Sequence, residues 1–456
     1  MKKYSLLIFL FALIGNSILY AQNSENESVI QEIKRIENIV KEWGPKYGHP
    51  GGEILVTDNL NKTIYHSSFG SINKNEEFIV ASATKPFTYG IVLILISEGK
   101  LSFDTKVNKY IPNVHPDVTV EMLLSHESGY INDFDDWFHG ENFESVLNRF
   151  VDKGPTAIMG YHSYSEDNSF MLAKIVELVT GLAIYDAWIE KICKPLELKD
   201  TFGKLPNDYF NTTPFYLPGK DSIKQVNFLD WRKSDGVRFI HPSAGLFSTA
   251  EDYSKFLNGF KHLVSKEIFE KATHQQNNKE YGYGFQVYDD IGLYGHSGAS
   301  GFAGFSNGEY TFIYWSPTIL NAGRWKRLLR ESSLFKPKSQ ELLTYYKELL
   351  PLAKEIDYLE IKDEYLGNYQ TVSKIPNYNG LSFTLEKEGQ TLKRVRGERT
   401  VDYWIRTNGN EFIRVNRDMK QYYPADIIIW DSGVFKIYSK ESHIAEKILI
   451  LETIKK

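Results

Sequence analysis

The chain has 456 residues, of which 42% are hydrophobic and 14% aromatic, enough for a large core and for two domains. Its 53 basic and 58 acidic residues give a formal net charge of -5 and are spread along the chain. The charge distribution therefore gives no sign of a nucleic-acid partner, because the basic residues form no basic run or tail in the sequence. The composition predicts a globular protein.

The N-terminus has the pattern of a cleavable secretory signal. Two lysines precede a nine-residue apolar run from Leu6 to Ile14, and the small residue Ala21 precedes a polar segment. We expect residues 1–21 to be a signal peptide and the protein to be periplasmic or secreted. The apolar run is shorter than the roughly 20 residues that span a bilayer, and no later segment is longer, so we expect no integral membrane segment after cleavage.

The chain contains one cysteine, Cys193, which excludes an internal disulfide and a lipid anchor on an N-terminal cysteine. A thiol nucleophile would need a polar, activating environment, whereas Cys193 lies among apolar residues in "KICKPLEL". We interpret Cys193 as a buried space-filling residue.

The first domain, which we place at residues 22–352, begins with a helix and a strand pair. "SVIQEIKRIENIVKEWG" carries apolar residues at helical spacing, and "GGEILVTD" and "KTIYHSSFG" read as strands joined by a polar turn. Strand-like sequence returns at residues 281–316. The middle of the domain carries helical patterns at residues 84–98, 143–152 and 168–180. The order predicts an α+β fold, an antiparallel sheet with segregated helices.

A second domain follows a last helix and a linker. The helix, at residues 339–350, ends before a proline, and we place the linker at residues 353–364. From residue 365 to 456 the chain has short alternating strands such as "LSFTLEKEG", with Leu381, Phe383 and Leu385 on one face. Turn signals recur at "EKEGQ", "RTNGNE" and "WDSGVF". They predict a meander of about eight strands that closes into a small barrel or sandwich.

One buried helix carries a pair of residues suited to nucleophilic catalysis. The apolar pattern predicts a helix from near Ser82 to about Glu98, with Pro86 in its first turn. Positions i and i+3 share a helix face, so Ser82 and Lys85 would lie within mutual reach. A serine needs a neighbour that takes its proton, and a lysine can do so only when burial or nearby positive charge lowers its pKa. The helix start would also offer N–H groups to an oxyanion.

The S-x-x-K spacing alone is weak evidence, because "SINK" at residues 71–74 has it too. Taken by themselves, Ser82 and Lys85 also fit a helix N-cap and a solvated lysine. The later motifs decide between these readings.

The run "VASATKPFTYGIVLILISEGKLSFDTKVNKYIP" with "VTVEMLLSHESGY" resembles the serine β-lactamase and penicillin-binding-protein superfamily, especially its class C β-lactamase, D-alanyl-D-alanine carboxypeptidase and esterase branch. The resemblance covers residues 27–350. Further matches in the family's order are "YSEDNSFMLAKIVELVTG", "KPLELKDTF", "SAGLFSTAEDYSKFL" and "YGHSGASGFAGF". It implies an exported serine hydrolase acting on a small-molecule or peptide substrate without a cofactor, of the carboxypeptidase and esterase type. The alternatives are a class C-like β-lactamase and a deacylation-impaired penicillin-binding sensor.

The resemblance also implies roles for single residues. Ser82 would be the acylated nucleophile and Lys85 its proton-transfer partner, and Tyr164 would be the general acid and base of the family's Y-x-N element. Tyr161 is a rival for that position, but the alignment of the following helix favours Tyr164. The N–H groups of Ser82 and Ala299 would form the oxyanion hole.

The third family element is "HSG", whose residues His296, Ser297 and Gly298 would lie along the substrate cleft. His296 has an alternative role as a bridge between strands. "GHSGA" also resembles a G-x-S-x-G nucleophile elbow, but the last position is Ala299 and no helical pattern follows, so Ser297 is not our candidate nucleophile.

The main departure from the family pattern is Glu166, which stands where the asparagine of Y-x-N is usual. A carboxylate cannot donate to a substrate carbonyl, would repel an anionic substrate and could keep Lys85 protonated. We therefore expect Glu166 to contact substrate and to shift substrate choice away from efficient β-lactamase action.

The remaining histidines do not indicate a metal site. His126 lies in "LLSHESGY", a family segment, and we interpret it as structural. His162 and His241 are isolated polar residues without metal-ligand spacing around them, so we predict no metal.

Overall fold

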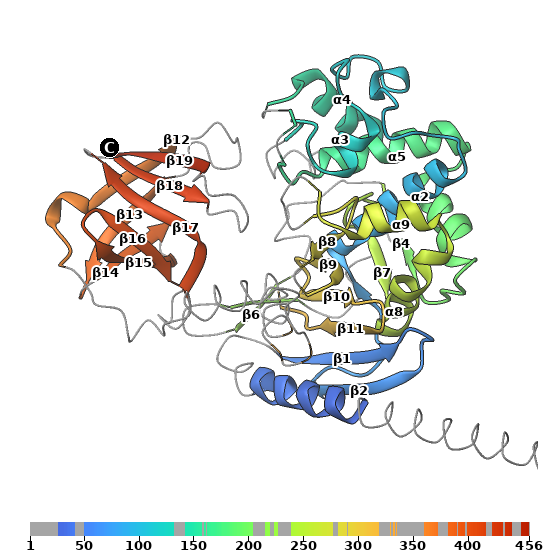
Figure 1. Cartoon of the computed structure of the whole chain (residues 1–456), viewed down its shortest axis with the longest axis horizontal. Coiled ribbons are helices and arrows are strands. Elements are labelled where there is room, and N and C mark those ends of the chain that lie inside the picture. Colours follow the sequence, from blue (N-terminus) through green and yellow to red (C-terminus); the bar gives the residue numbers. More distant parts are fainter. Residues whose placement is uncertain are drawn as a thin grey trace, which may run out of the picture.

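The structure is a computed structural model, and the elements are labelled in Figure 1. It describes residues 26–41, 50–131, 142–156, 159–160, 162–203, 215–218, 223–226, 239–276, 281–289, 291–318, 329, 332, 334, 360–372, 382–389, 391–396, 399–415, 422–431, 434–439 and 448–455. The predicted signal peptide and the predicted helix at 339–350 lie outside the described residues, as does most of the predicted linker. Among the described helices, none has the length and apolar character needed to cross a membrane.

A six-stranded antiparallel sheet forms the centre of the first domain, in the order β2-β1-β11-β10-β9-β8. Its strands are β1 (Gly51–Asp58), β2 (Thr63–Gly70), β8 (Gln286–Tyr288), β9 (Leu293–Gly298), β10 (Phe302–Ser306) and β11 (Tyr310–Trp315). Strand β11 pairs with β1, so the N-terminal hairpin and the C-terminal strands of the domain complete one sheet. The predicted strand pair at the N-terminus is confirmed.

Both faces of this sheet are covered by apolar clusters. Successive side chains of a strand point to opposite faces, so a single strand contributes to both clusters. Ile54 and Val56 of β1 pack in one apolar cluster with the helix at residues 26–41. Leu55 between them belongs to the other, larger cluster, which contains the central helices. Figure 1 shows the N-terminal helix along β1 and β2 and the remaining helices on the opposite side.

The helices of the domain include one that is buried on every side, α2. Residues 85–95 of α2 are all buried, and this helix packs against α5. A helix that is apolar all round belongs inside a protein, as the sequence predicted. The helices are α2 (Lys85–Ser97), α3 (Val120–Leu124), α4 (Phe143–Lys153), α5 (Asp167–Thr180), α6 (Ile184–Trp188), α8 (Ala250–Gly259) and α9 (Lys266–Thr273).

Local signals account for several helix ends. The side chain of Asn142 accepts the N–H of Ser145 at the start of α4, and Thr249 accepts the N–H of Asp252 at the start of α8. Helix α5 ends at Gly181 with φ 72°, the left-handed conformation that glycine adopts without steric cost.

Short elements connect these layers. The single-turn segments are η1 (Ala81–Thr84), η2 (Val107–Lys109), η4 (Ile189–Cys193) and η6 (Phe260–His262). The short strands are β3 (Phe78–Ile79), β4 (Phe202–Gly203), β5 (Phe215–Pro218), β6 (Ile223–Val226) and β7 (Leu246–Ser248). Strand β7 pairs with both β3 and β4, and β3 leads directly into η1. This small sheet therefore anchors the chain just before Ser82.

Two predicted segments differ in detail. The helix predicted from Ser82 begins as the 3₁₀ turn η1, and the α-helix starts at Lys85. Within residues 281–289 the only strand is β8, because the chain turns at Gly282 and Gly284 and Tyr281 forms only an isolated bridge with Gln286. A side chain at Gly284 (φ 81°) would lie 2.4 Å from Cβ of Tyr89, so this turn also packs directly on α2.

The C-terminal region forms a closed eight-stranded barrel, one of the two architectures that the sequence predicted. It closes because β12, the first strand, pairs with β19, the last. Phe383 and Leu385 are buried, as the alternation indicated, while Leu381 lies outside the described residues. The strands are β12 (Gly367–Val372), β13 (Ser382–Glu388), β14 (Thr391–Arg396), β15 (Arg399–Asn408), β16 (Glu411–Val415), β17 (Tyr422–Asp431), β18 (Val434–Ser439) and β19 (Ile448–Lys455).

Aromatic side chains fill the barrel. The turn η8 (Asp363–Tyr365) places Tyr365 against the rings of Phe412 and Trp430, with ring centroids 5.1 and 5.2 Å apart. Trp404 and Phe435 lie in the same cluster and are fully buried. An eight-stranded barrel is just wide enough for side chains to fill it.

Candidate active site

Ser82 lies on a strained turn between β3 and α2. The preceding residue, Ala81, has φ 47°, a left-handed conformation that is uncommon for a residue with a Cβ. Ala81 and Ala83 are buried, whereas Ser82 between them is partly exposed. The hydroxyl of Tyr253 donates to the carbonyl of Ala83 at 2.9 Å and fixes the turn from below. The turn therefore presents the Ser82 hydroxyl to solvent on a rigid base.

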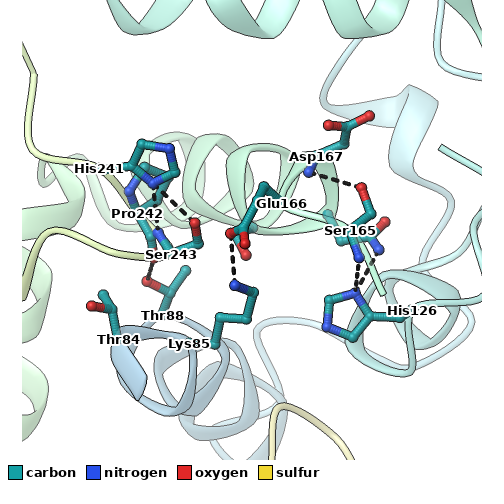
Figure 2. A network of polar contacts seen from close by, with 12 residues as sticks. Thr84, Lys85, Thr88, His126, Ser165, Glu166, Asp167, His241, Pro242 and Ser243 are labelled. Carbon is teal, nitrogen blue, oxygen red and sulfur yellow. Dashed lines mark hydrogen bonds and ion pairs between the residues drawn. The ribbon is translucent and has the colours of Figure 1, made fainter. Parts of the chain in front are cut away.

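Lys85 opens α2, is fully buried and points toward α5 (Figure 2). Its Nζ lies 2.6 Å from Oε2 of Glu166, the residue that precedes the first turn of α5. The same Nζ lies 4.6 Å from the ring centroid of Tyr164. The packing of α2 on α5 thus brings the S-x-x-K pair against the segment that carries Tyr164 and Glu166.

Tyr164 completes a group of three side chains with Ser82 and Lys85. The side chain of Ser82 is close enough to influence the Tyr164 hydroxyl, and 36% of the surface of Tyr164 is exposed. Desolvation of the hydroxyl, and then the negative charge of Glu166, raise the pKa of Tyr164 well above its usual value. The resting side chain is therefore a neutral phenol, although it lies next to a lysine.

Glu166 is buried and ionised. Burial acts to raise the pKa of its carboxyl, but the charges of Lys85 and His241 and hydrogen bonds with Lys85 and Ser243 outweigh it, so the pKa is lowered. Ser243 in turn lies with its Oγ 2.9 Å from Nδ1 of His241 (Figure 2). A carboxylate held in this way favours the ammonium form of Lys85.

Strand β9 brings the third motif against the nucleophile turn. A Cβ at Gly298 would lie 2.0 Å from the carbonyl oxygen of Val80 and 3.3 Å from Cβ of Ala81, so only glycine allows this approach. Ala299 follows it and, like Ser82, is partly exposed. The backbone N–H groups of Ser82 and Ala299 thus belong to adjoining segments, and the oxyanion hole remains a prediction.

The side chains of the third motif are turned toward protein groups. His296 is fully buried, with its Nδ1 2.7 Å from the carbonyl oxygen of Ser297 and its Nε2 3.3 Å from the hydroxyl of Tyr281. Ser297 donates its hydroxyl to Oε1 of Gln286 on β8 at 3.0 Å. Substrate contacts of His296, Ser297 and Gly298 therefore remain predictions.

Comparison with protein-family models decides the family. Residues 30–316 match the model described as Beta-lactamase. The chain belongs to the Beta-lactamase family. It is accordingly a serine hydrolase of the family that contains β-lactamases, penicillin-binding proteins, esterases and D-amidohydrolases, with that family's antiparallel sheet and helices.

This Beta-lactamase-family chain is similar to curated proteins of Bacillus subtilis and Staphylococcus aureus. It is 24% identical over 334 residues to "Penicillin-binding protein 4*" of Bacillus subtilis, covering 63% of this chain and 70% of that one. It is 26% identical over 225 residues to "Teichoic acid D-alanine hydrolase" of Staphylococcus aureus, covering 46% of this chain. The chain spans only 54% of that hydrolase, and 58% of "Protein flp" of the same species.

Solved structures share the fold. EstCE1, titled a hydrolase with promiscuous acyltransferase activity, has a TM-score of 0.58 at 16% identity and covers 67% of this chain and 98% of its own. The D-stereospecific amidohydrolase of Streptomyces sp. has a TM-score of 0.52 at 19% identity and covers 65% and 98%. The octameric penicillin-binding protein homologue of Pyrococcus abyssi has a TM-score of 0.55 at 18% identity and covers 92% and 99%.

Within this Beta-lactamase-family chain, the contact between Gly298 and the Ser82 turn can be tested directly. We expect Gly298→Ala to lower kcat/KM by about 10²-fold, because its Cβ must push β9 away from the nucleophile turn by about 1 Å. Steady-state kinetics with a hydrolysed ester would measure it.

Gly295→Ala is the matched control on the same strand. Its Cβ would meet the carbonyl oxygen of Gly304 at 2.0 Å, an equal clash made with β10 instead of the Ser82 turn. We expect both variants to lose thermal stability and the Gly298 variant alone to lose most of its activity. Equal losses of activity would remove the special role of Gly298.

Two groups that the sequence did not connect belong to the site. His241 and Ser243 meet Glu166 through the tertiary fold, and His126 packs its ring 4.7 Å from that of Tyr164. The only sequence signals were that His126 and Ser243 each lie in a segment that matches the family pattern. Tyr161, the rival of Tyr164, lies outside the described residues.

Cys193 is buried, and desolvation followed by the charge of Asp252 raises the pKa of its thiol to about 12. Such a thiol stays protonated, which fits a space-filling role. In the part of the chain that the structure describes, no three His, Cys, Asp or Glu side chains gather as a metal site would require.

Proposed function

We propose that this protein is an exported serine hydrolase that cleaves an ester or amide through an acyl-enzyme at Ser82, of the D-amino-acid peptidase and esterase type. The observation that carries the proposal is the grouping of Ser82 and Tyr164 beside buried Lys85, whose Nζ lies 4.6 Å from the ring centroid of Tyr164 and 2.6 Å from Oε2 of Glu166. Export is proposed from the signal pattern of residues 1–21.

In the acylation step, Oγ of Ser82 forms a bond to the substrate carbonyl carbon and gives up its proton to the phenol of Tyr164. Tyr164 passes its own proton to the leaving alcohol or amine as the bond to that group breaks. A free tyrosinate never has to form, which is consistent with the raised pKa of Tyr164. In deacylation the steps run in reverse, with water in place of the leaving group. Tyr164 accepts a proton from the water as its oxygen bonds to the acyl carbon, and Tyr164 returns a proton to Oγ of Ser82 as the acid leaves.

Lys85 acts in this proposal through its charge. Its ammonium lies over the Tyr164 ring and stabilises the negative charge that develops on the two oxygens during proton transfer. An ammonium paired with a carboxylate at 2.6 Å is a poor proton acceptor, so Tyr164 takes over the transfer. The N–H groups of Ser82 and Ala299 would hold the oxyanion.

The charges of the site favour substrates that lack a carboxylate next to the reacting bond. The positive charge of Lys85 is balanced by Glu166, and the third motif begins with His296 where many β-lactamases have lysine. A penicillin or a peptide with a C-terminal carboxylate would bring a negative charge toward Glu166. The printed activities of the relatives, a teichoic acid D-alanine hydrolase and a D-stereospecific amidohydrolase, support an ester or amide of a D-amino acid.

The Lys85–Glu166 pair also favours a second candidate, a protein that is acylated but releases its acyl group slowly. Deacylation needs a group that accepts a proton from water, and a lysine held as an ammonium does not provide one. Such a protein would act as a sensor rather than as an enzyme with turnover.

Incubation with four substrates separates these candidates. The mature protein is mixed with a short-chain nitrophenyl ester of D-alanine, a D-Ala-D-Ala peptide, a chromogenic cephalosporin and a fluorescent penicillin, and turnover and intact mass are recorded. We expect turnover of the ester and little turnover of the β-lactams. Stoichiometric acylation without release would support the sensor, and fast cephalosporin hydrolysis would contradict the charge argument.

A further inference from the structure

One histidine holds the chain on both sides of Tyr164. The carbonyl oxygen of His126 accepts the N–H of Ser163 at 2.7 Å, and Nδ1 of its ring accepts the N–H of Ser165 at 3.2 Å. Its ring also packs against the ring of Tyr164, with centroids 4.7 Å apart and planes 35° apart. The neighbours of Tyr164 in the chain and its aromatic face are therefore all in contact with a single residue.

The backbone of His126 is itself adapted to this task. Its φ is 60°, in the left-handed region, where histidine is less disfavoured than most residues. This conformation turns the carbonyl and the imidazole of His126 toward the same segment. The side chain is fully buried, so its contacts are not made with solvent.

The hydrogen-bond partners assign the tautomer of this imidazole. Nδ1 accepts the N–H of Ser165 (Figure 2). The amide Nδ2 of Asn168 also donates to Nδ1 at 2.9 Å, so Nδ1 carries no proton. The amide is oriented by Ser128, whose hydroxyl donates to Oδ1 of Asn168 at 2.5 Å. The ring proton therefore lies on Nε2.

The Nε2–H of His126 begins a directional chain toward β9. It faces the hydroxyls of Tyr281 at 3.2 Å and Tyr89 at 3.3 Å. Tyr281 faces Nε2 of His296 at 3.3 Å, and Nδ1–H of His296 donates to the carbonyl of Ser297 at 2.7 Å. The two imidazoles are in opposite tautomers, and the phenol of Tyr281 connects them.

A charged imidazole does not fit this chain. Burial, and then the electrostatic effects of His162 and Lys85, lower the pKa of His126 well below its usual value. A proton on Nδ1 would also place donor against donor at Ser165 and Asn168.

We propose that His126 is the positioning residue of Tyr164: as a neutral imidazole it fixes the phenol over Ser82 and connects this segment to the β9 strand. The inference rests on the proposed function of Ser82 and Tyr164. It goes beyond a role in packing, because the acceptor at Nδ1 and the donor at Nε2 have separate duties. The acceptor Nδ1 orients Tyr164 through the N–H of Ser165. The donor Nε2–H connects this segment to β9 through Tyr281.

Two substitutions separate the duties of the two ring nitrogens. In His126→Asn the amide oxygen replaces the acceptor at the Nδ1 position, and asparagine tolerates the positive φ. In His126→Gln the amide nitrogen reaches the Nε2 position, and the acceptor near Ser165 is lost. We expect the Gln variant to lose about 10²-fold in kcat with little change in KM, and the Asn variant to stay within about tenfold of wild type.

The measurements are kcat and KM on the hydrolysed ester, the rate of Ser82 acylation by intact mass, and thermal unfolding of each variant. A Gln variant with wild-type kcat would overturn the proposal. The proposal would also be overturned if both variants lost kcat equally and in proportion to their loss of stability, since a role in packing alone predicts that result.

The proposal can fail separately from the proposed function. If the wild-type protein neither turns over nor is acylated, the function of Ser82 is wrong, and nitrogen NMR of the imidazoles then decides the role of His126. We expect Nε2–H at His126 in the wild type and a changed environment of the Tyr164 ring in the Gln variant. A proton on Nδ1 of His126, or an unchanged Tyr164 ring, would overturn the inference.

Discussion

Ser82→Ala will lower turnover by about 10⁶-fold, because no other group at the turn can form the acyl bond. Ser82 is partly exposed, so the loss of its hydroxyl should leave the fold and the Lys85–Glu166 pair intact. Three measurements check this prediction. Steady-state kinetics measures the loss of turnover, intact mass after incubation with a fluorescent penicillin measures the loss of acylation, and a thermal unfolding curve measures whether the fold is intact.

The chain offers a matched control for this substitution. Ser71 is the first residue of the other S-x-x-K sequence and is exposed. Its hydroxyl donates to the carbonyl oxygen of Pro50 at 3.4 Å. Ser71→Ala should keep wild-type kinetics and labelling. Covalent labelling of the Ser82 variant at another residue, such as Ser297, would show that the nucleophile has been assigned to the wrong serine.

Glu166→Gln will destabilise the folded protein by about 3–5 kcal/mol, because it leaves the ammonium of Lys85 buried without a balancing charge. Lys85 is fully buried and Glu166 is 5% exposed, so solvent screens the pair little. The double variant Lys85→Met, Glu166→Leu should recover most of this stability while remaining inactive, since apolar side chains can replace a buried ion pair. Denaturant unfolding measures all three proteins.

The stability contribution of Glu166 should also depend on pH. Its folded-state pKa is lowered from the ordinary 4.5, so the contribution is fully present above that unfolded value. It is lost as the pH falls through the folded-state pKa. The difference in unfolding free energy between the wild type and Glu166→Gln should accordingly shrink in acid.

A surface pair provides the comparison. Lys266 and Glu270 on α9 are 3.7 Å apart and their side chains are 89% and 55% exposed. Glu270→Gln should change stability by less than about 0.5 kcal/mol. If Glu166→Gln proves equally harmless, the buried Lys85–Glu166 pair is not ionised, and both our account of Lys85 as a cation and our substrate argument fail.

Local patterns were sufficient for the elements. The apolar spacing in residues 26–41 predicted a helix, and the apolar pattern with few breaks after Ser82 predicted a buried helix. Alternation along β13 predicted buried Phe383 and Leu385. These features follow from side-chain periodicity within one segment, which does not depend on the rest of the fold.

The motif positions were also legible in the sequence. The pair Ser82 and Lys85 could be recognised because one helical turn relates them, and the sequence order of the other family motifs marked Tyr164, Glu166 and His296. The start of α2 was less certain, because Ala81 takes a left-handed conformation that only the packing of β3 and β9 around it maintains.

Only the tertiary structure decided the chemistry of these residues. The packing of α2 against α5 sets Lys85 on Glu166 and makes the pair an ion pair. Desolvation of the Tyr164 hydroxyl and the negative charge of Glu166 keep Tyr164 a neutral phenol. The hydrogen bond from the N–H of Ser165 to His126, next to Tyr164, and the contact of Glu166 with Ser243 join segments that lie far apart in the chain. Charge states and proton directions depend on burial and on such partners, and the sequence of a single segment does not contain either.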